Sequence, residues 1–182
     1  KETISKYGKI DVLVNNAAVQ VMGDLVEMKE EDITRLLDVN LKGAILASKY
    51  TLPFMQTQRA GAIIHVSSVL GLSGDPDLAV YGATKGGLIA LCKSMAVAYG
   101  PYGIRVNCIC PGDVNTPMVK DYFDHQPDPA KARAEVFAHY PLRRIAEPSE
   151  VAAAIAFLTS DEASFISGTQ LLVDGGLSAE VY

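Results

Sequence analysis

The chain has 182 residues, of which 49% are hydrophobic, and this is enough apolar material for the core of one globular domain. Sixteen Lys and Arg residues against 21 Asp and Glu give a net charge of −5 without a basic stripe, so we expect no nucleic-acid partner. The longest apolar stretches, such as Val151–Leu158, fall far short of the roughly 18 residues that a membrane helix needs, so we expect no membrane span.

The cysteine and histidine positions do not suggest a metal site. Cys92, Cys108 and Cys110 are odd in number and lack the paired spacing of zinc ligands. We expect all three to be reduced thiols in the core of the protein. His125 lies among acidic residues, but their spacing fits no zinc pattern and favours a solvated loop. The sequence therefore predicts a cytoplasmic protein without a bound metal.

Short apolar runs rich in β-branched residues alternate with longer helical patterns along the chain. The expected strands span residues 10–14, 62–66, 104–109 and 169–173. The expected helices span residues 30–56, with Pro53 kinking the end, residues 79–99 and residues 148–159. Strands that are apolar throughout and separated by helices indicate a parallel sheet with helices on both faces, which is a doubly wound α/β fold.

In such a sheet the ligand binds beyond the carboxyl ends of the strands. The segments that follow the first three strands are residues 15–18, Ser67-Ser68 and residues 111–116, and we expect functional side chains there. Residues 117–147 break the strand-helix pattern, and their Pro and Asp content predicts an insertion of short helices at this edge. We expect residues 1–182 to form a single domain that contains this insertion.

Tyr81 and Lys85 are four positions apart in an expected helix, so their side chains lie on one face about one turn apart. A phenol transfers protons poorly at neutral pH unless a nearby cation favours its ionised form, and Lys85 is placed to supply this effect. Taken alone, the pair also fits a solvent-exposed helix surface. Ser68 ends the second expected strand, where its hydroxyl and the Tyr81 phenol can reach one substrate oxygen, although a serine there also fits a turn or a helix cap.

Several motifs resemble those of the short-chain dehydrogenase/reductase family, in the order that the family has them. They are Asn15-Asn16-Ala17-Ala18, with Ala18 in place of the usual Gly, Asn40, Ser68 with Tyr81 and Lys85, Pro111-Gly112-Asp113-Val114-Asn115-Thr116, Ile166-Ser167-Gly168-Thr169-Gln170 and Val173-Asp174-Gly175-Gly176. The resemblance covers nearly the whole chain. It implies the C-terminal portion of a Rossmann-like doubly wound parallel sheet and an NAD(P)-dependent oxidoreductase that acts on a secondary alcohol or ketone, such as a sugar, a steroid, a cyclic alcohol or a 3-oxoacyl thioester.

The resemblance implies a role for each candidate catalytic residue. Ser68 and Tyr81 would hydrogen-bond the substrate oxygen, and Tyr81 would give or take the proton as hydride moves to or from the nicotinamide. Lys85 would lower the pKa of the phenol and bind the nicotinamide ribose. Asn40 would hold a water molecule that links Lys85 to solvent, although Asn40 taken alone also fits a polar helix residue that satisfies the backbone.

The resemblance also implies contacts to cofactor, substrate and a second subunit. The expected contacts to NAD or NADP are Asn15, Ala17, Tyr81, Lys85, Pro111, Gly112, Val114 and Thr116. The expected substrate contacts are Ser68, Leu70, Tyr81, Asp113 and Met118, and we expect Phe123 to face the same pocket. The helices at 30–56 and 79–99 carry more apolar positions than one buried face needs, which suits the homotetramer or homodimer that the family resemblance implies.

The Gly-rich turn that binds the pyrophosphate in this family does not occur in the sequence, nor does the residue about 20 positions later that distinguishes NAD from NADP. We expect three strands and their helices upstream of Lys1. The favoured interpretation is that the sequence omits the N-terminal part of a normal enzyme, and the alternative is a truncated polypeptide. A second functional hypothesis is a non-catalytic nucleotide-binding or scaffold protein with the same fold, against which Asn40, Ser68, Tyr81 and Lys85 argue.

Overall fold

The computed structural model describes residues 2–179, which contain one four-stranded parallel sheet. Its strands are β1 (Val12–Asn15), β2 (Gly61–Val66), β3 (Ile104–Pro111) and β4 (Gln170–Val173), and they lie side by side in chain order. The register places Leu13 beside Ile63 and Ile63 beside Val106. The predicted parallel sheet is confirmed, and each strand begins and ends close to its expected position.

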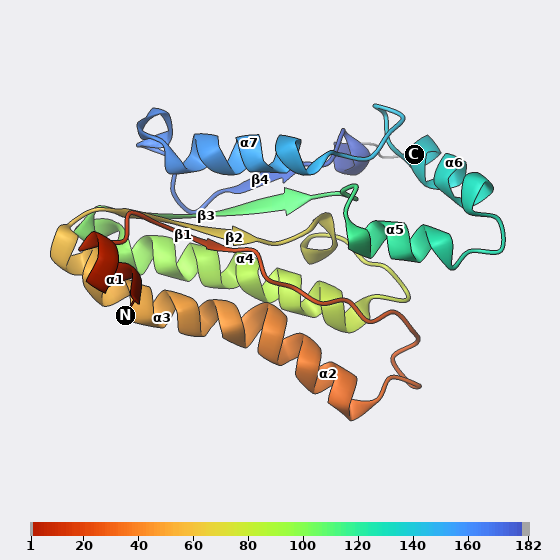
Figure 1. Cartoon of the computed structure of the whole chain (residues 1–182), viewed down its shortest axis with the longest axis horizontal. Helices are drawn as coiled ribbons and strands as arrows, with labels where there is room; N and C mark the ends of the chain where they lie inside the picture. Colours follow the sequence, from red (N-terminus) through yellow and green to blue (C-terminus); the bar gives the residue numbers. More distant parts are fainter. Residues whose placement is uncertain (1, 180–182) are drawn as a thin grey trace.

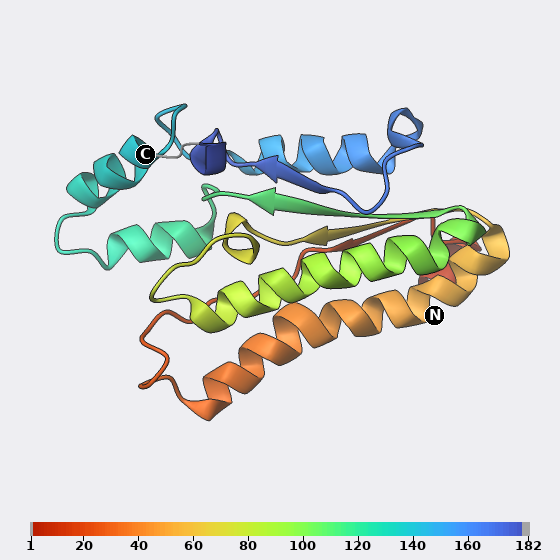
Figure 2. The same cartoon turned by 180° about the vertical axis from the view of Figure 1, so that it is seen from behind.

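Helices cover both faces of this sheet (Figure 1). On one face lie α3 (Gly43–Gln58) and α4 (Ala79–Tyr99), and on the other lies α7 (Pro148–Thr159). The view from behind shows α3 and α4 running alongside each other on their face (Figure 2). The short α1 (Glu2–Tyr7) precedes β1. Within residues 2–179, every helix is too short or too polar to cross a membrane.

Neighbouring residues of one strand contribute to a separate core on each face of the sheet. Ile63 is buried in a cluster with Met55 of α3 and Cys92 of α4, whereas Ile64 is buried in a cluster with Leu158 of α7. Successive side chains of a strand point to opposite faces, so a strand that is apolar at every position requires a cover on both faces. The three cysteines are buried free thiols, as predicted.

The long helix expected over residues 30–56 is divided in the structure. It consists of α2 (Glu30–Leu36), a π-helical segment (residues 37–42) and α3, which continues past Pro53 to Gln58. The helical region thus extends two residues past its expected end at Gln56, and Pro53 lies inside α3. A proline removes the hydrogen bond to the carbonyl four residues earlier, and here both Pro53 and Lys49 are exposed, so water can satisfy that carbonyl. The helix ends instead at Arg59, which adopts the left-handed conformation.

The insertion (residues 117–147) folds as α5 (Pro117–Asp124) and α6 (Pro129–His139), which lie beyond the carboxyl ends of the strands (Figure 1). Each helix begins with a proline in its first turn, and the Asp128 side chain caps α6 by accepting a hydrogen bond from the Lys131 N–H at 3.0 Å. The insertion has its own small core, formed by Phe123, Tyr140 and Ile145. This core keeps the insertion at the edge of the sheet where ligand binding is expected.

Candidate active site

A cavity of about 660 Å³ opens at the carboxyl edge of the sheet. It lies where the segments that follow β1, β2 and β3 meet the two helices of the insertion. The predicted site residues that line it are Ala17, Ser68, Leu70, Tyr81, Lys85, Pro111, Gly112, Asp113, Val114, Thr116 and Met118. Asn15 and Asn40 do not line it. A volume of this size is typical of sites for small molecules and cofactors, which span roughly 300–1,000 Å³.

Ser68 is held on a short 3₁₀ turn that follows β2. Its Oγ accepts a hydrogen bond from the Leu70 N–H at 3.1 Å. The turn packs directly on α4 because two glycines leave room for it. A Cβ atom on Gly71 would lie 2.9 Å from the backbone carbonyl carbon of Lys85, and one on Gly82 would lie 2.9 Å from the Leu70 carbonyl oxygen. The two glycines thus allow Ser68 to approach the first turns of α4.

Tyr81 and Lys85 lie on one face of α4, with Lys85 Nζ 5.3 Å from the centre of the Tyr81 ring. Lys85 is only 3% exposed, and its ammonium donates a hydrogen bond to the Val66 carbonyl oxygen at 2.9 Å. Burial disfavours the charged form of an amine and lowers the pKa of Lys85 to about 8. Lys85 is therefore a buried cation anchored to the end of β2.

The phenol of Tyr81 is harder to ionise in this structure than a free tyrosine. Burial raises the pKa of Tyr81 to about 12, the Asp113 carboxylate adds to the increase, and the Ser68 hydroxyl opposes it. Burial and the Asp113 charge set the direction of this shift, while the Lys85 ammonium is turned to the Val66 carbonyl. The lowering of the phenol pKa by Lys85 stays a prediction. At neutral pH the phenol is protonated and able to donate.

Asn40 is buried in the π-helical segment, and its side chain is occupied by hydrogen bonds. Its Oδ1 accepts from the Val19 N–H at 2.8 Å, and its Nδ2 donates to the Val19 carbonyl at 2.9 Å and to Thr84 Oγ1 at 3.3 Å. The Thr84 hydroxyl donates to the Tyr81 carbonyl at 2.7 Å. Asn40 thus ties the segment after β1 to the helix that carries Tyr81, while its role in holding a water molecule stays a prediction.

Asn15 turns its side chain away from the cavity. Its Nδ2 donates to Ser48 Oγ at 3.2 Å and lies 3.1 Å from His65 Nδ1. The next residues along the chain, Asn16 and Ala17, do line the cavity. The contact between Asn15 and a cofactor stays a prediction, and the hydrogen bonds show that the side chain is already engaged elsewhere.

The segment after β3 is joined to the insertion by a residue that the sequence did not reveal. The Asp113 N–H donates to Tyr140 Oη at 2.6 Å, and the Tyr140 hydroxyl donates to Asp113 Oδ2 at 2.8 Å. Val114 also forms an isolated parallel β-bridge with Ala146, which joins the same two segments of the chain. The only local signal at Tyr140 is the following proline, which marks a helix end and not a buried phenol.

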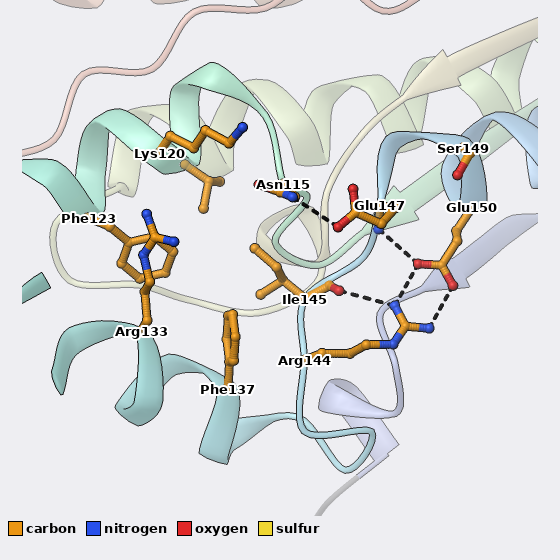
Figure 3. A pocket seen from close by; sticks show the side chains of 11 residues that line it. Asn115, Lys120, Phe123, Arg133, Phe137, Arg144, Ile145, Glu147, Ser149 and Glu150 are labelled. Carbon is orange, nitrogen blue, oxygen red and sulfur yellow. Dashed lines mark hydrogen bonds and ion pairs between the residues drawn. The ribbon is translucent and has the colours of Figure 1, made fainter. Parts of the chain in front are cut away.

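A second cavity, of about 420 Å³, lies between the insertion and the N-terminus of α7 (Figure 3). Phe123 lines this cavity with Phe137, so the expectation that Phe123 faces the substrate pocket is wrong. At the α7 side, Arg144 makes a bidentate ion pair with Glu150 at 2.6 and 2.7 Å. Because Ser68, Tyr81 and Lys85 line the larger cavity, the larger cavity is the candidate active site.

In the described residues 2–179, no group of three His, Cys, Asp or Glu side chains is placed to hold a metal ion.

Residues 1–178 match a family model described as enoyl-(acyl carrier protein) reductase. A 3-oxoacyl-acyl-carrier-protein reductase from Thermotoga maritima is 42% identical over 177 residues, which are 97% of this chain and 70% of that protein. Meso-2,3-butanediol dehydrogenase from Serratia marcescens is 41% identical over 178 residues, which are 98% of this chain and 68% of that protein.

Solved structures agree with these matches. A Burkholderia xenovorans protein described as a short-chain dehydrogenase/reductase has a TM-score of 0.95 and 35% identity, and the match covers 100% of this chain and 70% of that one. The chain belongs to the short-chain dehydrogenase/reductase family. The chain is also similar to the ligand-free structure of aldohexose dehydrogenase from Thermoplasma acidophilum, with a TM-score of 0.93 and 39% identity. This match covers 99% of this chain and 72% of that one.

Membership of the short-chain dehydrogenase/reductase family identifies this chain as an NAD(P)-dependent oxidoreductase. The structure of the neighbour ElxO, at 32% identity and a TM-score of 0.91, contains bound NADP. The predicted family, fold, enzyme class and cofactor class are confirmed.

Proposed function

We propose that this chain carries the catalytic centre for reversible hydride transfer between NAD(P) and a secondary alcohol or ketone, with Tyr81 as general acid or base. One observation carries the proposal. The Ser68 hydroxyl, the Tyr81 phenol and the Lys85 ammonium line a single cavity at the carboxyl edge of the sheet. A non-catalytic scaffold with this fold has no use for a half-buried phenol beside a buried ammonium, since a buried ammonium is costly to desolvate.

The chemistry of these side chains fits both directions of the reaction. In ketone reduction, Tyr81 donates its proton to the substrate oxygen, and Ser68 donates a hydrogen bond to the same oxygen as negative charge develops. The raised pKa of Tyr81 keeps the phenol protonated for this step. In alcohol oxidation the phenolate accepts the proton, and the Lys85 cation stabilises that phenolate. The nicotinamide, when bound, supplies or accepts the hydride.

The residues around the cavity fit a nicotinamide dinucleotide. The buried Lys85 ammonium suits the hydroxyls of a ribose, because an ammonium is a donor only. The other proposed contacts that line the cavity are Ala17, Tyr81, Pro111, Gly112, Val114 and Thr116. Asn15 remains a proposed contact through its backbone, since its side chain is bonded to Ser48 and His65.

We further propose that residues 1–182 belong to one Rossmann-like domain, in which the insertion forms the substrate loop. Met118 and Val136 of its two helices line the cavity beside Leu70 and Asp113, which supports this role. Buried free thiols support a reducing compartment such as the cytoplasm. A homodimer or homotetramer is supported by apolar side chains that α3 leaves exposed.

The test is an activity assay of the full-length protein with NADH and NADPH against a panel of ketones, and with NAD and NADP against the matching alcohols. Tyr81→Phe is expected to lower kcat/KM by about 10²- to 10⁴-fold without changing the thermal unfolding transition, because only the proton-transferring hydroxyl is lost. Tyr7→Phe, on the exposed helix α1, serves as the matched control and should keep full activity. Turnover that persists in Tyr81→Phe would contradict the assignment, and a wild-type protein that turns over nothing would favour the scaffold hypothesis.

A further inference from the structure

The Asp113 carboxylate is held at the wall of the cavity by a buried phenol from the insertion. Tyr140 is 2% exposed, and its hydroxyl donates to Asp113 Oδ2 at 2.8 Å. The oxygen of the Tyr140 hydroxyl in turn accepts a hydrogen bond from the Asp113 N–H at 2.6 Å. One phenol therefore bonds to both the backbone and the side chain of Asp113. Such a charge-assisted bond is stronger than a neutral one.

Tyr140 is itself fixed by the packing around it. A Cβ atom on Gly112 would lie 2.8 Å from Tyr140 Oη and 2.9 Å from its ring, so the ring occupies the space that a side chain would need. The chain that follows Tyr140 then runs beside the Asp113 segment, where the Ala146 N–H donates to the Asp113 carbonyl at 3.0 Å and the Asn115 N–H donates to the Ala146 carbonyl at 2.8 Å. Asp113 is consequently a rigid group in the site.

The second oxygen of the Asp113 carboxylate is left for a ligand. Oδ1 of Asp113 has no hydrogen-bond donor among residues 2–179, whereas Oδ2 is bonded to Tyr140. Asp113 lines the same cavity as Ser68 and Tyr81. A carboxylate held in place accepts a hydrogen bond from a hydroxyl and repels another anion that lies close to it.

We propose that Asp113 is a specificity-determining residue, that Tyr140 is the residue that positions it, and that together they select neutral diols or hydroxyketones over substrates with a carboxylate near the reacting carbon. This inference rests on the proposed function, in which Ser68 and Tyr81 bind the reacting oxygen. The hydroxyl of the reacting carbon meets Ser68 and Tyr81, and the second hydroxyl donates to Asp113. A carboxylate in the place of the second hydroxyl would face Asp113 instead.

Three alcohols that differ in one substituent test the proposal with the full-length enzyme. Propylene glycol, isopropanol and lactate carry a hydroxymethyl group, a methyl group and a carboxylate beside the same carbinol. The wild-type kcat/KM is expected to fall in that order. Asp113→Asn should reduce the preference for propylene glycol over isopropanol about 10-fold or more and should raise the relative kcat/KM for lactate, since a hydrogen bond to a charged acceptor is stronger than one to a neutral amide.

Tyr140→Phe separates positioning from direct contact, because it keeps the ring against Gly112 and removes only the hydroxyl. It should weaken the same preference by less than Asp113→Asn, and mainly through KM. Asp121→Asn is the matched control, since it removes a carboxylate from the exposed surface of α5 outside the cavity. The Asp121→Asn variant should have the same selectivity among the three alcohols as the wild type.

A pH profile provides a readout that structural damage would not mimic. The titratable groups that line the cavity with Tyr81 are Asp75, Lys85, Asp113, His139 and Tyr140. The Asp113 charge raises the pKa of Tyr81. In Asp113→Asn, the rise of kcat/KM for alcohol oxidation that follows ionisation of Tyr81 should therefore occur at lower pH.

Three results would overturn the selectivity assigned to Asp113. These are an unchanged ratio in Asp113→Asn, lactate as the preferred substrate of the wild type, and no turnover of any of the three alcohols by an enzyme that is active on the wider panel. Inactivity on the whole panel, or activity that survives Tyr81→Phe, counts against the proposed function instead.

Discussion

His65 is a fully buried histidine in the middle of the sheet. Its Nδ1 lies 3.1 Å from the Asn15 amide nitrogen, which can only donate, so Nδ1 is the acceptor and Nε2 carries the proton. Among residues 2–179, Nε2 has no hydrogen-bond partner. Burial lowers the pKa of His65 to about 4, because a charged imidazole would lose its hydration there.

This shift predicts a loss of stability in mild acid. Between pH 6.5 and about 4, the unfolded chain binds a proton at His65 that the folded chain does not, so the free energy of unfolding falls as the pH falls. The loss amounts to about 3 kcal/mol by pH 4, at roughly 1.4 kcal/mol per pH unit. Urea unfolding at a series of pH values measures it.

His65→Asn keeps a polar side chain next to Asn15 but cannot titrate, so it should lose this part of the pH dependence. His125→Asn, at the exposed end of α5, is the control and should retain it. An identical slope in wild type and His65→Asn would show that other groups cause the acid sensitivity.

At the scale of elements, the turn after β2 depends on close contact with α4. A Cβ atom on Gly71 would lie 2.9 Å from both the Lys85 backbone and Ser67 Oγ, and neither of these can move easily. Gly71→Ala is therefore expected to lower the free energy of unfolding by roughly 1–3 kcal/mol and to lower kcat, because the Ser68 turn must shift away from Tyr81.

Gly74→Ala provides the matched control for this turn. A Cβ atom on Gly74 would have no atom within 4 Å, so the substitution should leave both stability and kcat close to wild type. Chemical denaturation and steady-state kinetics on the two variants give the comparison. Equal behaviour of Gly71→Ala and Gly74→Ala would mean that the close packing of this turn does not position Ser68.

The elements that local signals define were predicted well from the sequence. Helices α4 and α7 lie where the helical spacing and Pro148 place them. The π-helical segment was not predicted, because it accompanies hydrogen bonds between Asn40 and Val19, which is 21 positions away. Periodicity reports on which face of a helix is apolar, and it carries no information on such distant partners.

For the whole molecule, the site was predictable to the extent that parallel strands bring their carboxyl ends together. Ser68, Tyr81 and Lys85 follow from that rule and from helical spacing. Tyr140 escaped prediction because its burial results from contacts with Gly112 and Asp113, which are distant in sequence. The side chain of Asn15 also depends on distant partners, Ser48 and His65.

The exposed side of α3 leads to a prediction about assembly. Leu46, Tyr50 and Phe54 recur at helical spacing and are all exposed, with Tyr50 at 67%. A second subunit would bury this row, so Tyr50→Glu combined with Phe54→Glu is expected to lower the oligomeric state of the full-length protein in light scattering after size-exclusion chromatography. Val26→Glu, at an exposed apolar residue outside α3, is the control. An assembly of unchanged mass in the double variant would exclude this surface as the interface.

The contact between Gly112 and Tyr140 makes these two positions mutationally dependent on each other. Alanine at position 112 would collide with the phenol, and a smaller residue at position 140 would leave a void under the wall of the cavity. Each substitution alone is expected to lower the free energy of unfolding, and a smaller residue at position 140 offsets part of the loss caused by alanine at position 112. A side chain at position 112 on the sheet side is therefore expected to be tolerated only together with a smaller side chain at position 140 on the insertion side.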